Sequence, residues 1–343
     1  MLGATPEAEK AEIRAGLHSG AIKLVIGTHA LLEEPVTFAN LKIAVIDDQH
    51  RFGVHQRAAL RNKGENPHLL VMTATPIPRS LALTIYGDLD LTVIDEMPPG
   101  REAVDTFVLR PNERERAYTL IRKQIEGGRQ IFIIYPLVEE SEKSDSKAAK
   151  EEHQRLQAEV FPNQKLGLLY GKLKAAEKEE VMAKFRDKEY QILVSTSVVE
   201  VGLDIPNATV MVIEGANRFG LAQLHQFRGR VGRGDGKSYC LLIPEGNTPV
   251  ENERLKVMTE TNDGFELAEH DLTQRGPGQF LGSRQSGFSE FNLANMSNVR
   301  IIEKARKEAQ TLLQEDPELE KPEHQLLAHS LAQLWASGEG DIS

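Results

Sequence analysis

The stretch from Ser195 to Gly234 reads STSVVEVGLDIPNATVMVIEGANRFGLAQLHQFRGRVGRG and ends in two arginines with glycines between them. Arg230 and Arg233 stand next to glycines, which keep their guanidinium groups close to the backbone. Such groups can bind a phosphate that they reach only when two protein surfaces come together around it. An isolated pair of this kind is also typical of a basic, solvated turn. The same stretch supplies three further loop or helix positions: Gly202, Asp204 and Gln226. Their presence favours the phosphate interpretation over the bare turn.

The composition of the 343 residues, with 40% hydrophobic and 27% charged side chains, is ordinary for soluble α/β proteins and allows two cores. The sequence contains no run of eighteen apolar residues and no signal-peptide pattern, so it predicts no membrane span. The single cysteine, Cys240, excludes an internal disulfide and favours a reducing cytoplasm. Its apolar neighbours predict a buried thiol without a chemical role.

The net charge of −10 is unevenly distributed along the chain. Seven acids and one lysine lie between Thr311 and Ser343, so this tail carries −6 and the first 310 residues carry −4. Nucleic-acid binding depends on local basic patches rather than on net charge, so the overall balance does not exclude it. We expect the acidic tail to lie away from a phosphate path.

Apolar runs alternate with helical patterns through the first 245 residues. Such alternation predicts mostly parallel sheets covered on both faces, with the functional loops beyond the carboxyl ends of the strands. The prolines and glycine of Met97–Glu102 indicate a hinge. The strands expected before the hinge are 23–26, 42–46 and 68–72. Those expected after it are 106–109, 130–135, 166–169, 191–194, 209–213 and 238–243.

Helices are expected where apolar residues recur at helical spacing, and the first runs to about His18 and stops at Gly20. The segment 139–152 is rich in Ser, Lys and Glu and is expected to be a mobile surface loop that leads into a helix. Beyond residue 245 the alternation ends. The helices expected there are 251–260 and 266–273, which form a hairpin, and then 299–313 and 322–334. The predicted domains are therefore 1–101, 102–245 and 246–343.

Polar residues follow two strands of the first domain. Asp47 and Asp48 come directly after the strand KIAVI, where one carboxylate can hold Mg²⁺ through water and a second can act on the attacking water. A bare acidic turn is the alternative interpretation. Thr73 and Thr75 follow the next strand. Their hydroxyl groups can connect the nucleotide site to the path of a bound nucleic acid.

Several blocks of the sequence resemble one protein family. DDQHRFGVHQR, MTATPIPRSLAL, MPPGRE, PLVEESE, the stretch from Ser195 to Gly234 and RGPGQFLGSRQSG are together similar to the RecG branched-DNA helicases of superfamily 2. They cover the chain nearly end to end. The related transcription–repair coupling translocases share the general arrangement of these motifs. The resemblance implies an α/β fold with tandem RecA-like parallel-sheet lobes, the first truncated, then an α-helical hairpin with the translocation motif and C-terminal helices.

The same resemblance implies the motor of an ATP-dependent DNA helicase that remodels stalled forks and Holliday junctions in recombination and repair. It implies ATP and Mg²⁺ as cofactors, branched duplex DNA as partner, a monomer, and a bacterial cytoplasmic location at the nucleoid. Asp47 is expected to hold Mg²⁺ and Asp48 to act on water. The other residues expected at ATP are Gly202, Asp204, Gln226, Arg230 and Arg233. Those expected to couple to DNA are Thr28, His29, Thr73, Thr75, Thr196, Ser197, Arg254, Arg275 and Gln285.

The chain departs from the family pattern in two places. It contains no GxxxxGK[ST] phosphate loop, so that loop and a wedge domain are expected upstream of Met1, and the chain alone is expected to be inactive. Asp48 stands where the family has Glu, and its carboxylate is one methylene shorter. Two other functions stay open: a fragment of a transcription–repair coupling translocase, and a non-catalytic DNA-binding module that lacks the phosphate loop.

Overall fold

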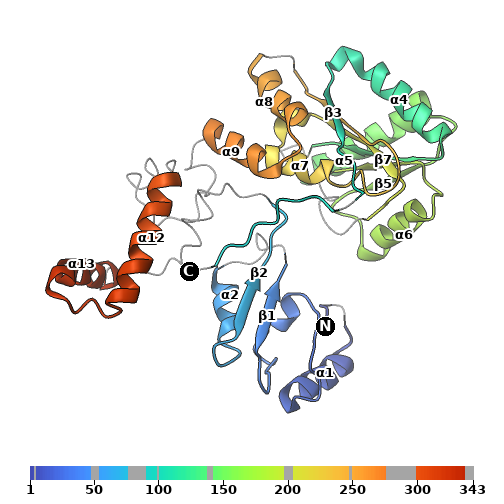
Figure 1. The fold of residues 1–343 in the computed structure, drawn as a ribbon. Coiled ribbons are helices and arrows are strands. Elements are labelled where there is room, and N and C mark those ends of the chain that lie inside the picture. Colours follow the sequence, from blue (N-terminus) through green and yellow to red (C-terminus); the bar gives the residue numbers. More distant parts are fainter. Residues whose placement is uncertain are drawn as a thin grey trace. The chain divides into compact units, whose positions relative to one another are not determined.

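The computed structural model divides the chain into two compact units, Met1–Thr75 and Pro76–Ile342 (Figure 1). The residues that it describes are 1–3, 5–47, 54–75, 90–98, 100–136, 142–196, 204–246, 249–275 and 299–336. In the second unit, helices cover both faces of a parallel sheet, which confirms the predicted α/β class. In the parts of the chain that are described, no helix is long and apolar enough to cross a membrane.

The first unit contains a small parallel sheet and a helix that ends where the sequence predicted. Helix α1 (Glu7–Ser19) stops before Gly20, whose amide donates to the carbonyl of Leu17. Strands β1 (Ile43–Ile46) and β2 (His68–Val71) pair in parallel. Among its described residues, the unit also contains the 3-10 turn η1 (His29–Leu31) and helix α2 (Val54–Arg61).

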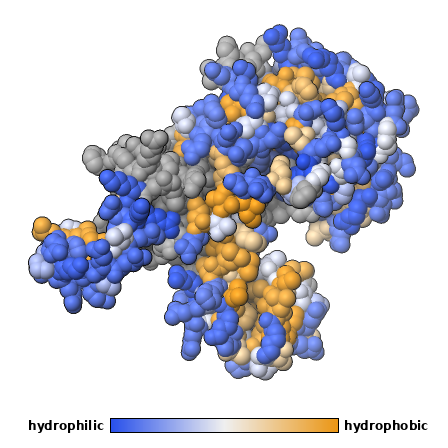
Figure 2. Space-filling model, viewed as in Figure 1, coloured by the Kyte–Doolittle hydropathy of each residue, from blue (hydrophilic) through white to orange (hydrophobic). Residues whose placement is uncertain are grey.

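The strand predicted at 23–26 is wrong, because these residues are irregular in the structure. The carbonyl of Ile26 accepts a hydrogen bond from the amino group of Met1, at 2.5 Å. The described part of this unit offers no strand ladder beside the segment, and an apolar run forms a strand only where its backbone groups pair with another strand. The side chains of Leu24 and Ile26 are instead 80% and 81% exposed, and Figure 2 shows apolar residues at the surface of this unit.

The second unit is built on six parallel strands in the order β3-β8-β7-β4-β6-β5. The strands are β3 (Asp105–Val108), β4 (Gln130–Ile134), β5 (Leu166–Leu169), β6 (Ile192–Ser195), β7 (Ala208–Glu214) and β8 (Tyr239–Ile243). All residues of β4 and β7 are buried, as expected for central strands covered on both faces. Each strand lies within two residues of its predicted position.

Two apolar clusters pack on the opposite faces of this sheet. On one face, Tyr118 and Ile121 of α4 (Arg114–Glu126) and Leu156 of the π-helical turn η4 (Leu156–Val160) contact strand residues. The other face is covered by α6 (Ala175–Arg186), α7 (Leu221–Arg228), α8 (Pro249–Glu260) and α9 (Gly264–Arg275). Cys240 is fully buried among them, and burial raises the pKa of its thiol to about 12, so it is an inert core residue.

The prediction that 139–152 is a surface loop that leads into a helix is wrong in where the helix starts, because helix α5 already begins at Glu142 and runs to Arg155. Its Glu, Lys, Ser and Ala residues give the composition of a solvated loop, but Ala, Glu and Lys are also strong helix formers. Ala149 is 2% exposed and Glu152 accepts a hydrogen bond from the hydroxyl of Tyr135, at 3.1 Å. These contacts hold the helix on the sheet.

The described residues beyond β8 are mainly helical, as predicted. After the hairpin of α8 and α9 come α12 (Val299–Glu315), the 3-10 turn η7 (Pro322–His324) and α13 (Gln325–Ala336). Asp316 joins the last two helices, because its carboxylate accepts bonds from the amides of Glu320 and Lys321 and lies 2.7 Å from Nδ1 of His324. These bonds lower the pKa of Asp316, with His324 contributing most.

Candidate functional site

Arg230 and Arg233 lie in the turn that joins α7 to β8. The Nε of Arg233 donates to the carbonyl of Gly229 at 3.0 Å, and its Nη1 lies 3.4 Å from a carboxylate oxygen of Asp204. The structure therefore brings together Arg233 and Asp204, two of the residues predicted at ATP. Gln226 lies in the last turn of α7, four residues before Arg230.

This turn lies at the amino-terminal edge of the sheet, so the prediction that all functional loops lie at the carboxyl edge is wrong for it. Gly234 packs against the carbonyl of Pro206, which precedes β7. The carbonyl of Ser238, at the other end of the turn, accepts a hydrogen bond from the amide of Asp105, the first residue of β3. The carboxyl-edge rule concerns connections from a strand to a helix. Here α7 returns the chain to the opposite edge before β8 begins.

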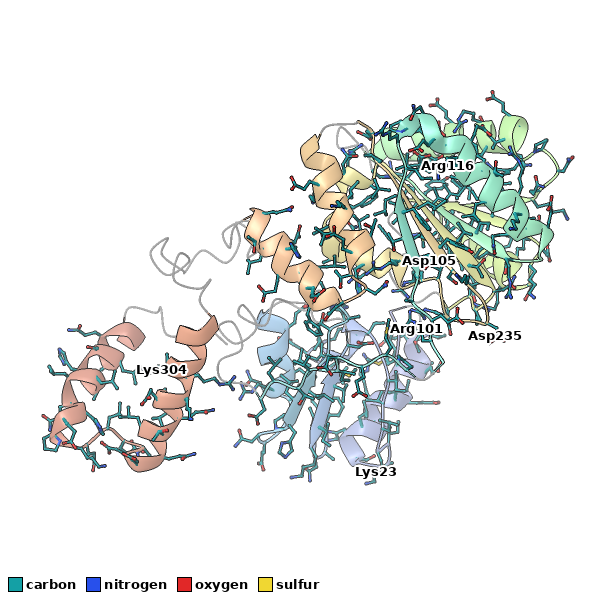
Figure 3. All side chains as sticks on the ribbon, turned by 45° about the horizontal axis from the view of Figure 1, so that its top comes forward. Lys23, Arg101, Asp105, Arg116, Asp235 and Lys304 are labelled. Atoms are coloured by element: carbon teal, nitrogen blue, oxygen red, sulfur yellow. The ribbon has the colours of Figure 1, made fainter. Side chains whose placement is uncertain are left out.

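A third arginine, Arg101, joins this turn and was missed by the sequence analysis. Its Nη2 donates to the carbonyl of Gly229 at 3.1 Å, so Arg101 and Arg233 share one acceptor. Burial lowers the pKa of Arg101, and the charge of Arg233 lowers it further. Figure 3 shows Arg101 near Asp105, at the same end of the second unit. Arginines gathered around one carboxylate leave a net positive turn that suits an anion.

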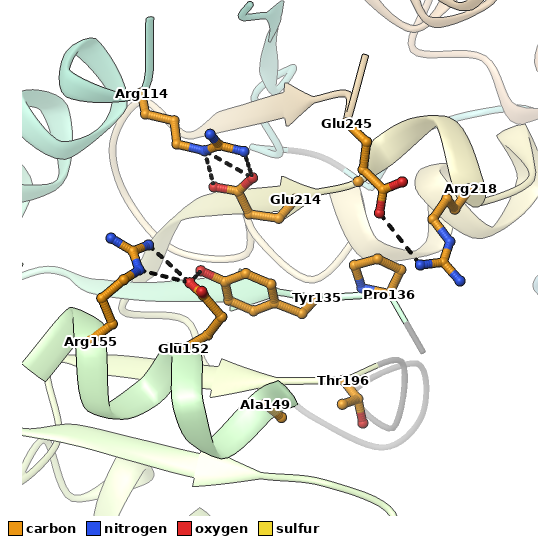
Figure 4. Close-up of a pocket in the computed structure, with 11 residues that line it drawn as sticks. Arg114, Tyr135, Pro136, Ala149, Glu152, Arg155, Thr196, Glu214, Arg218 and Glu245 are labelled. Carbon is orange, nitrogen blue, oxygen red and sulfur yellow. Dashed lines mark hydrogen bonds and ion pairs between the residues drawn. The ribbon is translucent and has the colours of Figure 1, made fainter. Parts of the chain in front are cut away.

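A pocket of about 430 Å³ lies at the opposite, carboxyl edge of the same sheet (Figure 4). It is lined by residues that follow β4, β6, β7 and β8 and by residues of α4 and α5: Arg114, Tyr135, Pro136, Ala149, Glu152, Arg155, Thr196, Glu214, Gly215, Arg218 and Glu245. Thr196 is 2% exposed, and its Oγ1 has no hydrogen-bond partner within the described part of the chain. Thr196 is thus the predicted DNA-coupling residue that the structure places in a cavity.

Three arginine–glutamate pairs line this pocket. Arg114 binds Glu214 through Nε and Nη2, and Arg155 binds Glu152 through the same two atoms, each with a shortest distance of 2.9 Å. Hydrogen bonding to these glutamates raises the pKa of both guanidinium groups. The third pair, Arg218 and Glu245, is separated by 3.4 Å. No local pattern predicts the pair of Arg114 and Glu214, because the two residues lie 100 positions apart in the chain.

Two arginines join α7 to the helical hairpin, one at each end of α7. Arg254 of α8 donates to the carbonyls of Asn217 and Phe219, just before α7 begins. Arg228, the last residue of α7, donates to the carbonyls of Met258 and Thr261, at 2.8 and 2.9 Å. Arg228 is 2% exposed, so these bonds are shielded from water. Arg254 was predicted to couple to DNA; Arg228 was not predicted.

In the first unit, the predicted residues follow neighbouring strands. Asp47 is exposed directly after β1, and Thr73 follows β2 at the same edge, since the amide of Met72 donates to the carbonyl of Ile46. The Oγ1 of Thr73 accepts the amide of Thr75, at 3.1 Å. The remaining predicted residues of this unit, Thr28 and His29, lie at the start of η1.

The described residues contain no group of three His, Cys, Asp or Glu side chains that could enclose a metal. One exposed carboxylate such as Asp47 is compatible with Mg²⁺ binding, because Mg²⁺ in proteins usually takes most of its ligands from water and from substrate phosphates. Four predicted residues lie outside the described residues: Asp48, Ser197, Gly202 and Gln285. Arg275 ends α9, but its side chain is also outside them. The functional roles assigned to all of these positions stay predictions.

Two family models match the chain. Residues 113–235 match the helicase conserved C-terminal domain, and residues 261–337 match the C-terminal part of domain 3 of the ATP-dependent DNA helicase RecG. The relatives named ATP-dependent DNA helicase RecG include one from Synechocystis sp., 54% identical over 93% of this chain and 39% of its own length. Another, from Thermotoga maritima, is 51% identical over 93% of this chain and 41% of its own length.

Solved structures agree with the sequence comparisons. A RecG chain in a structure described as bound to a three-way DNA junction has a TM-score of 0.68 and 48% identity, over 88% of this chain and 39% of that one. The helicase MrfA, in a complex with DNA, shares the fold with a TM-score of 0.56 at 18% identity. The chain spans about two fifths of the length of the first two relatives. Over 93% of its residues it is similar to proteins named ATP-dependent DNA helicase RecG.

Proposed function

We propose that the chain is the motor portion of an ATP-dependent helicase that remodels branched DNA such as forks and Holliday junctions. The observation that carries this proposal is the 48% identity, over 88% of the chain, to a RecG chain described as bound to a three-way DNA junction. The domain boundaries 1–101, 102–245 and 246–343 belong to the proposal. The family-model matches at 113–235 and 261–337 support them, because each falls inside one domain.

The turn after α7 is the proposed contact with the γ-phosphate of ATP. Arg233 is held in advance by Asp204 and by the carbonyl of Gly229, and Arg101 adds positive charge beside it. Preorganised guanidinium groups stabilise the charge that develops on a transferred phosphoryl group. ATP with Mg²⁺ supplies the free energy of hydrolysis, and Asp47 is the proposed Mg²⁺ contact through water.

The opposite edge of the second unit is the proposed DNA side. Thr196 and the arginine-lined pocket lie there, and α7 connects this edge to the turn that carries Arg233. The two arginines at the ends of α7 tie it to the helical hairpin. A change at the nucleotide can therefore reach both the DNA side and the hairpin through one packed helix. We place this activity on chromosomal DNA at the nucleoid.

The test is a chimera in which the part of the Thermotoga maritima relative before the aligned region precedes residue 1 of this chain. We expect the chimera to hydrolyse ATP when a three-way junction is added and to separate the branches. Arg233→Ala should lower turnover at least 100-fold while junction binding persists, because the arginine acts on the transition state. The chain alone should show no turnover. A chimera that binds junctions but never hydrolyses ATP, where the intact relative does, would contradict the proposal.

A further inference from the structure

Two guanidinium groups bind one carbonyl at the end of α7. Nε of Arg233 and Nη2 of Arg101 both donate to the carbonyl of Gly229, at 3.0 and 3.1 Å. A carbonyl oxygen has two lone pairs, so it accepts both bonds at once. Gly229 directly follows α7, where helix carbonyls lack partners within the helix and attract cations. This carbonyl therefore stays hydrogen-bonded when one of the two arginines leaves it.

Arg233, the arginine proposed at the γ-phosphate, must give up two bonds to reach a phosphate. Its second partner, Asp204, is 68% exposed and lies 3.4 Å from Nη1, and exposed ion pairs contribute little to stability. Gly229 is half-buried, and a shielded carbonyl that loses all its hydrogen bonds destabilises the structure. The release of Arg233 therefore depends mainly on whether this carbonyl keeps another donor.

Backbone packing fixes Arg101 beside the turn that carries Arg233. Arg101 lies four residues before Asp105, the first residue of β3 (Figure 3). The amide of Asp105 donates to the carbonyl of Ser238, at 2.9 Å. Gly232 has a positive φ of 75°, and a Cβ there would lie 3.0 Å from Cγ2 of the buried Val104. The segment that carries Arg101 is thus packed against the turn at two further points.

The charges around this carbonyl also favour the release of Arg233. Burial, and to a smaller extent the charge of Arg233, lowers the pKa of Arg101, whereas Asp204 acts in the opposite direction. Repulsion between two cations is mutual, so the charge of Arg101 acts on Arg233 as well and favours its movement towards an anion. Arg101 thus supplies both a donor that stays on the carbonyl and a charge that repels Arg233 from it.

We propose that Arg101 is a positioning residue for Arg233 in ATP hydrolysis: it keeps the carbonyl of Gly229 bonded when Arg233 turns to the γ-phosphate, and its charge favours that turn. Arg101 itself touches no nucleotide in this arrangement. Without Arg101, the departure of Arg233 removes the second of the two guanidinium donors from the carbonyl. The proposal rests on the proposed function, since it requires Arg233 at the γ-phosphate.

The test measures steady-state ATP hydrolysis by the chimera described above, with a saturating three-way junction. We expect Arg101→Met to lower kcat about tenfold, the effect of losing one hydrogen bond from a charged group. KM for ATP should stay within about twofold, because Arg101 acts on an interaction made after ATP has bound. Arg101→Lys keeps a donor and the charge, so its kcat should stay within about threefold of the unaltered chimera. Arg101→Gln keeps a donor without the charge and should lie between the Lys and Met variants.

A double-mutant cycle separates positioning from a purely structural role. If Arg101 acts through Arg233, Arg101→Met should lower turnover no further once Arg233 is replaced by alanine. A structural residue would instead lower turnover by the same factor in both backgrounds. The matched control is Arg122→Met, which removes an arginine that donates to the carbonyl of Val160 at 3.3 Å, on the opposite face of the sheet from α7. Its kcat should equal that of the unaltered chimera.

The outcomes distinguish the positioning role from the proposed function. If Arg101→Met changes kcat no more than Arg122→Met does, or lowers it equally in both backgrounds of the cycle, the positioning role is overturned and the proposed function stands. No turnover by the unaltered chimera, where the intact relative hydrolyses ATP, overturns the proposed function and the positioning role with it. If Arg101→Met lowers the melting temperature, Arg101→Gln takes its place in the cycle, because it keeps a donor for Gly229.

Discussion

His225 is the residue whose ionisation the fold changes most clearly at accessible pH. Its Nδ1 accepts a hydrogen bond from Arg228 at 3.0 Å. Burial, together with a smaller effect of the charge of Arg228, lowers the pKa of His225 to about 4, whereas Asp263 acts in the opposite direction. The folded protein therefore keeps this imidazole neutral, while the unfolded chain protonates it near its usual pKa of 6.5.

This difference predicts that the free energy of unfolding falls with acid. The unfolded state binds the extra proton between pH 6.5 and 4, so the contribution of His225 is complete above that window and is lost as pH decreases through it. A shift of this size corresponds to about 3 kcal/mol. His225→Asn keeps a short acceptor for Arg228 but cannot titrate, so its stability should fall less between pH 7 and pH 4.5.

Urea unfolding of the second unit at both pH values measures this effect. The matched control is His329→Asn, which makes the same change at an exposed histidine of α13. Equal acid dependence in His225→Asn and the wild-type protein would show that His225 is not the group responsible.

At the scale of elements, an arginine connects each end of α7 to the helical hairpin. The hairpin carries one of these arginines, and the other extends from α7 to the hairpin. Arg254 holds the carbonyls before α7, and Arg228 holds the carbonyls at the end of α8. This arrangement connects the hairpin, for which no nucleotide contact is predicted, to the turn that carries Arg233. It also places Arg254 beside the segment that carries Arg218.

We expect Arg254→Ala, in the chimera described above, to separate ATP hydrolysis from movement on DNA. The substitution leaves Arg233 and Asp204 intact, so junction-stimulated ATP turnover should stay within about threefold of the unaltered chimera. Branch separation should fall at least tenfold, because the start of α7 loses its tie to α8. Both rates are measured on one junction preparation. A proportional loss of both would assign Arg254 a purely structural role.

How much of the fold the sequence predicts depends on whether the signal is local. The signal for β5 (Leu166–Leu169) is local, because the apolar run LGLL lies within the strand itself. The strand was therefore predicted with its observed bounds. The loop predicted over α5 failed because a Lys- and Glu-rich composition fits a solvated helix as well. The pairing of Arg114 with Glu214 depends on tertiary neighbours, and no local pattern predicts it.

At the scale of the whole molecule, the first unit exposes one face of its sheet. Ala44 and Ile46 of β1 are buried, but Ile43 and Val45 are 62% and 55% exposed, and Leu70 of β2 is 53% exposed. Parallel sheets are normally covered on both faces, and exposed apolar patches promote association. The chain by itself should therefore self-associate through this face.

We expect the purified chain to bind a hydrophobic dye and to show light scattering that increases with concentration. Val45→Lys should reduce both, because it places a charge in the middle of the exposed face. Asn40→Lys adds the same charge at an exposed polar position and is the matched control. If both lysine variants lowered scattering equally, net charge rather than this apolar face would control association.

The path of α7 from one edge of the sheet to the other restricts how this protein can vary in length. The helix has eight residues, and each residue of an α-helix adds about 1.5 Å and a rotation of about 100°. One inserted residue would turn Arg228 away from the carbonyls of Met258 and Thr261 and displace the turn that holds Arg233. Insertions and deletions should therefore be excluded from α7, even where substitutions on its solvent side are accepted.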